Sequence, residues 1–343
     1  MNYKNVEKSN NIAGMLTLSI RLVVGWTYFS AFWRRLILEN KLDPDQAGYI
    51  GEKFNHFLPN ALGIKPIIEY LVSNPEALWI SMAVFTVVEA IVGLLFMLGF
   101  MTRLMSLGVL GLATGILLGS GWLGTTCLDE WQIGVLGMAA GFTVFLAGSD
   151  KYSIDNYLIK KELPITQKRW FNWVASGKLF NKKSMLDKVI LIGSLSIFAM
   201  TLFTNQYFHN GVWGKLHNKS VTPKIEISNG NLHKKQLSFT VFRVEGADVY
   251  GSFLIGITLK DKSGNIVFNL KNDDLAEFPP SKIENEYVAK VKPGKHSLII
   301  PLGSKAKLTI ENGALDSIQS GEYQLILTDI SGIEWQQRLY YPD

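Results

Sequence analysis

The 343-residue chain has a net charge of +5 and two contrasting halves. Residues 1–219 hold 20 Lys/Arg against 14 Asp/Glu, so the positive excess lies there, whereas residues 220–343 hold 14 against 15 and are nearly neutral. Its mean hydropathy of +0.15 is high for a soluble protein, and positive charge beside apolar segments is typical of a cytoplasmic membrane face and not of a nucleic-acid site. One cysteine excludes an intrachain disulfide and a multi-cysteine metal site, and without dinucleotide, P-loop or haem motifs we expect no metal or flavin cofactor.

Five segments are long and apolar enough to cross a membrane, which takes about 20 residues. The first carries Arg21 and the second Glu89. The first is too long for a signal peptide and lacks a small-residue cleavage site. Glycines at four-residue spacing in the third and fourth segments predict close helix packing. The expected spans are Ile12–Trp33, Ala77–Phe100, Leu104–Leu123, Trp131–Ser149 and Val189–Phe208.

The charges of the loops predict the orientation in the membrane. Asp150–Lys188 holds nine Lys/Arg and is therefore expected to be cytoplasmic. Counting helices from there places the N-terminus inside. The loop Arg34–Glu76, the loop around Cys127 and everything after the fifth helix are then outside. We expect a multi-pass protein of the plasma (inner) membrane with a periplasmic C-terminal domain.

After Lys219 the hydrophobic pattern changes to period two, which is typical of half-buried strands. Turn signals at Lys262–Asn265 and at Ser331-Gly332 separate some of these strands. Short strands at this density predict a β-sandwich. The expected strands are Gln236–Val244, Ser252–Lys260, Ile266–Leu270, Ser297–Pro301, Lys305–Glu311, Tyr323–Asp329 and Glu334–Tyr341.

The predicted fold is thus an α-helical membrane bundle, with a four-helix core plus one anchor helix, followed by an extracytoplasmic all-β sandwich. The expected parts are a four-helix transmembrane domain in residues 1–160, a basic cytoplasmic linker in 161–188, the fifth helix in 189–210, and the β-domain in 220–343.

Cys127 is the first candidate for chemistry, because it follows the third helix on the predicted outer side. It is either a reactive thiol or a small buried apolar residue. Asp129 and Glu130 oppose thiolate formation, and a neighbouring cation would favour it. We place Cys127 in a catalytic role and Asp129 in the substrate site.

Arg34 and Arg35 end the first span on the outer side, where the topology rule disfavours positive charge. Two guanidinium groups suit the binding of a small oxyanion. The alternative is that they anchor lipid head groups, with Trp33 in the interfacial belt.

Arg21 and Glu89 lie inside predicted spans, where a charge costs at least ~2.5–3.5 kcal/mol and therefore pairs or faces an aqueous path. We expect the two to pair with each other, either as a structural ion pair or as part of a quinone or proton path. The aromatic residues proposed for the same path are Trp26, Tyr28, Trp33, Trp122 and Trp131.

These residues resemble a known family. The resemblance rests on Arg21 with Gly25, Glu89 with Gly93, the run Leu98–Arg103 and the Gly-Thr-Thr-Cys loop. Residues 1–160 resemble DoxD, a membrane subunit of thiosulfate:quinone oxidoreductase (TQO) within the DoxX-like family. From the fifth helix onward the chain resembles the DoxA subunit.

The resemblance implies that two thiosulfate ions are oxidised to tetrathionate on the outer face and that the electrons pass to membrane quinone. It names thiosulfate, quinone and the bilayer as partners, and a homo-oligomer stays open. Two alternatives also remain, a transport component and a non-catalytic assembly or redox partner. The absence of an evident inverted repeat weighs against a transporter.

Overall fold

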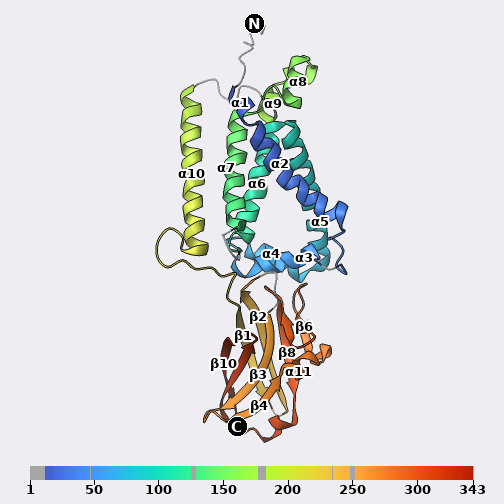
Figure 1. Cartoon of the computed structure of the whole chain (residues 1–343), viewed down its shortest axis with the longest axis vertical. Helices are drawn as coiled ribbons and strands as arrows, with labels where there is room; N and C mark the ends of the chain where they lie inside the picture. The colour runs from blue at the N-terminus through green and yellow to red at the C-terminus, as the bar shows by residue number, and fades with distance from the viewer. Residues whose placement is uncertain are drawn as a thin grey trace. The chain divides into compact units, whose positions relative to one another are not determined.

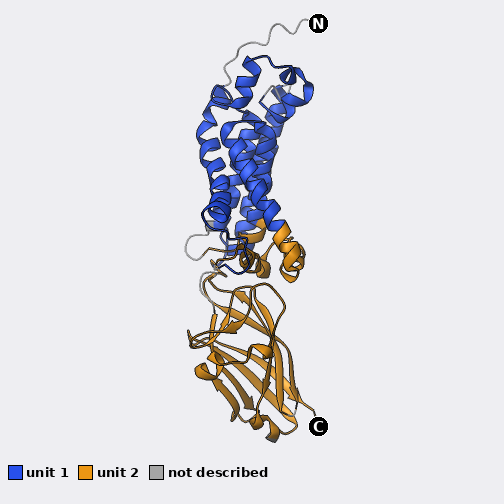
Figure 2. Cartoon of the chain, turned by 90° about the vertical axis from the view of Figure 1, so that its right-hand side faces the viewer, with its two compact units in different colours: residues 1–46, 81–117, 130–215 blue, residues 47–80, 118–129, 216–343 orange. Residues whose placement is uncertain are grey.

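The structure is a computed structural model of the chain. It describes residues 12–46, 48–124, 129–176, 183–233, 235–247 and 252–342. The chain forms two compact units (Figure 2). The first contains residues 1–46, 81–117 and 130–215 and is helical. The second joins residues 47–80 and 118–129 to the C-terminal β-domain, residues 216–343.

Four of the described helices are long and apolar enough to cross a membrane: α5, α6, α7 and α10. They agree with four of the five expected spans to within a few residues, except that α10 begins earlier. Figure 1 shows α10 running beside α7. The four helices are α5 (Pro75–Leu98), α6 (Thr102–Ser120), α7 (Asp129–Ala147) and α10 (Lys183–His209).

The first expected span consists of three consecutive pieces, α1 (Ile12–Leu16), α2 (Leu18–Phe32) and the π-helix η1 (Trp33–Leu38). The break falls at Thr17, whose hydroxyl donates to the carbonyls of Gly14 at 2.7 Å and Gly148 at 3.1 Å. A threonine that bonds back to its own helix bends that helix, so the interruption has a local cause.

Short helices occupy two stretches that the sequence analysis treated as loops. Between η1 and α5 the chain forms an amphipathic pair of helices, and between α7 and α10 it forms further short turns. The first group is α3 (Ile50–Phe57), η2 (Leu58–Asn60) and α4 (Lys65–Ser73); the second is α8 (Ile154–Lys160), η3 (Pro164–Gln167) and α9 (Arg169–Val174).

The β-domain contains two antiparallel sheets, which confirms the predicted helical bundle followed by a β-domain. One sheet has the strand order β1-β2-β8-β5, and the other has the order β10-β9-β3-β7-β6 with β4 also paired to β3. The strands are β1 (Lys224–His233), β2 (Gln236–Glu245), β3 (Ser252–Asp261), β4 (Ile266–Lys271), β5 (Ile283–Asn285), β6 (Lys292–Pro293), β7 (Leu298–Ile300), β8 (Lys305–Glu311), β9 (Gly321–Asp329) and β10 (Glu334–Tyr341).

A single apolar core holds the two sheets together. It includes Phe239 from β2, Ile257 from β3 and Leu308 from β8, all fully buried. Short non-strand elements of the same domain are α11 (Asn272–Ala276), η4 (Pro280–Lys282) and η5 (Gly313–Ser317). Inward residues alternate along the strands, as in other sandwiches.

Candidate functional site

Helices α2 and α5 contact each other through a pair of glycines. A Cβ on Gly25 would lie 2.7 Å from the carbonyl oxygen of Gly93, and a Cβ on Gly93 would lie 2.5 Å from the backbone nitrogen of Phe29. Side chains at either position would push the backbones apart. The two glycines therefore fix the register in which the remaining residues of α2 and η1 meet α5.

This register brings Arg35 to Glu89. The Arg35 Nη1 donates to Glu89 Oε2 at 2.6 Å and to the Thr86 hydroxyl at 2.9 Å. The Arg35 side chain is 13% exposed and that of Glu89 5%. The Arg35 guanidinium also lies 5.9 Å from the centre of the Phe85 ring. A buried, hydrogen-bonded ion pair between helices is thus present in the first unit.

The backbone at Arg35 is unusual. Arg35 lies in the π-helix η1, whereas Glu89 and Thr86 lie on regular turns of α5. A π-helical turn widens the helix and changes where a side chain points, and such turns are frequent at functional sites. We therefore take Arg35, Thr86 and Glu89 as the centre of the candidate site, here called the Arg35–Glu89 site.

The expected pairing of Arg21 with Glu89 is wrong. Arg21 is almost fully buried, but its Nη2 donates to the Tyr152 carbonyl at 2.9 Å. Its Nη1 lies beside Gly99, which directly follows the last residue of α5. Its Nε and Nη1 have no hydrogen-bond partner among the described residues. The contact between Gly25 and Gly93 sets the register of α2 against α5 and so separates Arg21 from Glu89. This register cannot be predicted from the spacing of residues in the sequence.

Tyr28 lies in the apolar core of the helical unit, 4% exposed, with residues such as Val92 and Phe96. A Cβ on Gly137 of α7 would be 3.1 Å from the Tyr28 hydroxyl oxygen, so this hydroxyl packs closely against the backbone of α7. Trp26 and Trp33 are exposed on the same helical run. Of the aromatic residues predicted on α2 and η1, Tyr28 alone is buried.

Arg34 is separate from its neighbour Arg35. It is exposed, and its Nε donates to the Ser30 carbonyl at 3.3 Å. Two adjacent arginines that were predicted as one anion site are therefore divided, with one on the surface and the other in the ion pair.

Residues around the Cys127 loop are only partly described. Cys127 lies outside the described residues, and Asp129 is described only as the first backbone residue of α7. Trp122 is fully buried and donates its Nε1 to the Phe57 carbonyl at 3.2 Å. Trp131 donates to the Thr204 hydroxyl at 3.0 Å, which ties α7 to α10.

A second buried polar cluster was missed by the sequence analysis. Asp155 is fully buried and accepts hydrogen bonds from the backbone nitrogens of Met101 and Thr102 and from the hydroxyls of Thr102 and Ser176. A carboxylate at this position caps the N-terminus of α6. Thr102 belongs to the run Leu98–Arg103 described above, but nothing local in the sequence indicates that Asp155, 53 residues later, is its partner.

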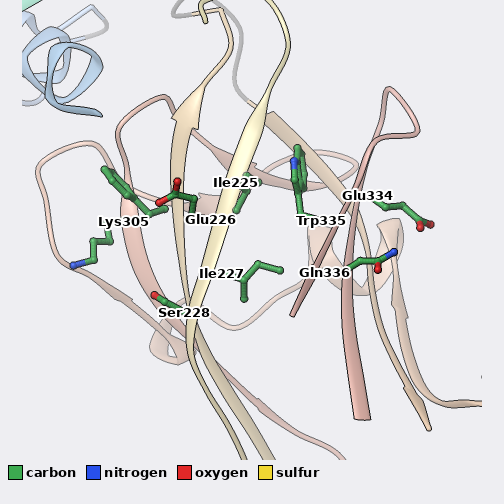
Figure 3. Close-up of a pocket in the computed structure, with 9 residues that line it drawn as sticks. Ile225, Glu226, Ile227, Ser228, Lys305, Glu334, Trp335 and Gln336 are labelled. Carbon is green, nitrogen blue, oxygen red and sulfur yellow. The ribbon is translucent and has the colours of Figure 1, made fainter. Parts of the chain in front are cut away.

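The β-domain has a groove of 670 Å³ between β1 and β10 (Figure 3). Its lining includes the carboxylates of Glu226 and Glu334, and its one lysine, Lys305, is paired with Glu286 at 2.7 Å. Two carboxylates and a neutralised lysine do not suit a small dianion. The residues predicted for the site lie elsewhere in the chain.

Among the described residues, three or more His, Cys, Asp or Glu side chains gather nowhere in a way that could hold a metal ion.

A family model described as "TQO small subunit DoxD" matches residues 16–192, and one described as "TQO small subunit DoxA" matches residues 208–338. The chain belongs to the DoxD family. A DoxA domain follows the DoxD region in the same chain, which confirms the predicted fusion. Because both families are TQO subunits, the protein is an oxidoreductase-type membrane protein.

The solved structures contribute less than the family models. The DoxD–DoxA chain is similar to the crystal structure of catalytically inactive OgpA from Akkermansia muciniphila in complex with an O-glycopeptide, with 10% identity and a TM-score of 0.20. The similarity covers 38% of this chain and 33% of OgpA. A similarity this weak carries no argument about fold or function.

Proposed function

We propose that the protein oxidises thiosulfate to tetrathionate on the outer face of the plasma membrane and reduces membrane quinone. Two thiosulfate ions lose one electron each and join through a new sulfur–sulfur bond. Quinone takes up the two electrons with two protons. The observation that carries the proposal is that one chain contains both TQO subunit families, with a buried ion pair inside the DoxD region.

The Arg35–Glu89 site supports the quinone half of this reaction. Arg35 and the Thr86 hydroxyl are hydrogen-bond donors of the kind that bind a quinone carbonyl, and Glu89 is a carboxylate that can take up and release a proton. Quinone bound there accepts electrons and needs protons at its oxygens. In this proposal Arg35 orients the head group, and Glu89 supplies a proton with Tyr28 nearby. Arg21 is left with a structural role at the other end of α2.

Arg34 is proposed to bind thiosulfate, since it is the exposed member of the arginine pair. Asp129 stays a prediction for the substrate site, and Trp122 and Trp131 stay predictions for an apolar wall against the quinone. Cys127 is proposed as the catalytic thiol. Its thiolate forms a bond to the outer sulfur of one thiosulfate as two electrons leave for quinone. A second thiosulfate then attacks that same sulfur, which releases tetrathionate and restores the thiolate.

The experiment uses the purified full chain with thiosulfate as sole electron donor and a short-chain quinone as acceptor. We expect two thiosulfate ions consumed and one tetrathionate formed for each quinone reduced. Cys127→Ala should abolish turnover, and mass spectrometry of the parent should find Cys127 heavier by one thiosulfate. Turnover in Cys127→Ala would exclude the covalent step. No quinone reduction by the parent would overturn the proposed function and favour the transport or assembly alternative.

The anion role of Arg34 is tested in the same assay. Replacing Arg34 with Gln removes a charged hydrogen bond, worth ~1.5–3 kcal/mol, and should raise the KM for thiosulfate roughly tenfold or more with little change in kcat. Lys53→Gln is the matched control, because Lys53 is an exposed cation of the same outer loop. An unchanged KM in Arg34→Gln would assign Arg34 to lipid anchoring.

A further inference from the structure

The helices α3 and α4 belong to the DoxD match by sequence and to the β-domain by contact. Residues 50–73 lie within the DoxD match at 16–192, yet they form one compact unit with residues 216–343. The two families are described as two different subunits. We propose that the segment Ile50–Ser73 is a docking surface for the DoxA domain, and that the two stay bound when the covalent link between them is cut. The contacts between this segment and the DoxA domain are called the joint.

The centre of the joint is Asn55, which is fully buried. Its Nδ2 donates to the Gly303 carbonyl at 3.0 Å, and its Oδ1 accepts from the Ala289 backbone nitrogen at 3.1 Å. The Asn55 side-chain amide is thus hydrogen-bonded to the backbone of two separate loops of the DoxA domain. A buried amide with both ends bonded gives the joint a defined geometry, because any shift leaves a polar group unpaired.

Backbone shape adds to this selectivity. Gly303 has a φ of +73°, and a Cβ built on it would collide with the carbonyl oxygen of Asn55. Only glycine allows this approach. On α4, the Val72 carbonyl accepts from the Val288 backbone nitrogen at 3.1 Å. The DoxA loop that contains Val288 therefore forms a backbone hydrogen bond with the C-terminal end of α4.

Side chains complete the polar part of the joint. The Tyr287 hydroxyl donates to Glu69 Oε1 at 2.8 Å, and burial together with Glu69 raises the pKa of Tyr287, which keeps it protonated as the donor. Asn60 donates its Nδ2 to the Val244 carbonyl at 2.9 Å and accepts from Lys219 Nζ at 2.9 Å.

Apolar contacts fill the space between these hydrogen bonds. Leu58, Ile68 and Val72 are almost fully buried and pack with Tyr287 of the DoxA domain. A buried apolar centre with a polar surround is the usual anatomy of a subunit interface. Gly124, at the end of the described part of the DoxD outer loop, adds a second anchor, because its carbonyl accepts from Asn218 at 2.7 Å and from the Ser220 hydroxyl at 2.6 Å.

The covalent link is suited to cutting. Residues 210–217 are all exposed, and a Cβ on Gly214 would meet nothing within 4 Å. A protease site is therefore inserted between Gly214 and Lys215 of the full chain. The purified protein is cut in mild detergent and passed over a size-exclusion column in a dilution series. We expect the DoxA fragment to elute with the membrane fragment, and separation at all concentrations would overturn the proposal.

Two pairs of variants locate the interaction. Gly303→Ala should weaken the association of the cut fragments at least tenfold. Its control is Gly332→Ala, because Gly332 has a similar φ of +83° and open space around it. Both variants carry the same backbone strain, and only Gly303→Ala collides with Asn55. Equal release by the two would overturn the role of the joint.

The second pair changes the helical side and leaves the DoxA domain intact. Asn55→Ala should also release the fragment, whereas Lys53→Ala, an exposed neighbour on α3, should not. Equal behaviour of these two variants would contradict the proposal. The readout is association, so a chain without thiosulfate oxidation still gives a clear result.

Discussion

Arg35 and Glu89 hold opposite charges 2.6 Å apart within a helical unit made mostly of apolar residues. Removing one partner leaves the other charge buried without compensation, which costs ~3–5 kcal/mol in comparable buried pairs. We expect Arg35→Gln and Glu89→Gln each to lower the midpoint of thermal unfolding in detergent. The double variant should recover most of the loss, because two neutral amides can bond to each other.

The control for this cycle is Arg34→Gln, which removes an exposed guanidinium from the same helical turn and should leave the midpoint nearly unchanged. Single variants as stable as the parent would show that the ion pair has no energetic weight. A double variant that folds but no longer reduces quinone would assign the pair to the quinone site. Full quinone reduction by it would remove that role.

At the scale of elements, the contact between α2 and α5 depends on two glycines. A Cβ on Gly93 meets the backbone of Phe29 at 2.5 Å, and backbone cannot move aside as a flexible side chain does. Gly93→Ala should therefore separate the helices, weaken the Arg35–Glu89 ion pair and lower the thermal midpoint.

Gly111→Ala on α6 is the control, because a Cβ there meets nothing within 4 Å. Since alanine favours helix over glycine by ~0.8–1.0 kcal/mol, that control should be neutral or slightly stabilising. Equal losses in both variants would contradict the close contact.

The elements themselves were largely predictable from sequence, because apolar length and period-two alternation are local signals. Strand β1 was missed, since Ser228 to Gly230 resembles a turn and instead forms an irregularity within the strand. The short helices α3 and α4 were also missed.

The candidate site was predictable only in part. Glu89 was predicted as a candidate residue because a charge in an apolar span stands out. Its partner was misassigned, because whether Arg21 or Arg35 faces Glu89 depends on the helix register, and a glycine contact between distant residues sets that register. The Asp155 cluster was missed because Asp155 and Thr102 lie 53 residues apart in the sequence and only the fold brings them together.

At the scale of the whole molecule, the nine basic residues of Asp150–Lys188 predict which side of the membrane each part occupies. Protease added to intact spheroplasts should cut the exposed segment near residues 210–217 and spare Asp150–Lys188, as read on a denaturing gel. After permeabilisation both should be cut. Cleavage of Asp150–Lys188 in intact spheroplasts would reverse the proposed orientation.

The short exposed link before the DoxA domain has a further consequence, because it acts as a tether. A short flexible tether holds its two ends at an effective concentration on the order of 1 mM. If the cut fragments bind with a dissociation constant of about 1 μM, a hundredfold weakening still leaves roughly nine in ten intact chains closed. With these values, a fused chain tolerates substitutions at the joint that would separate two unlinked subunits, and we expect such defects to be measurable only after the tether is cut.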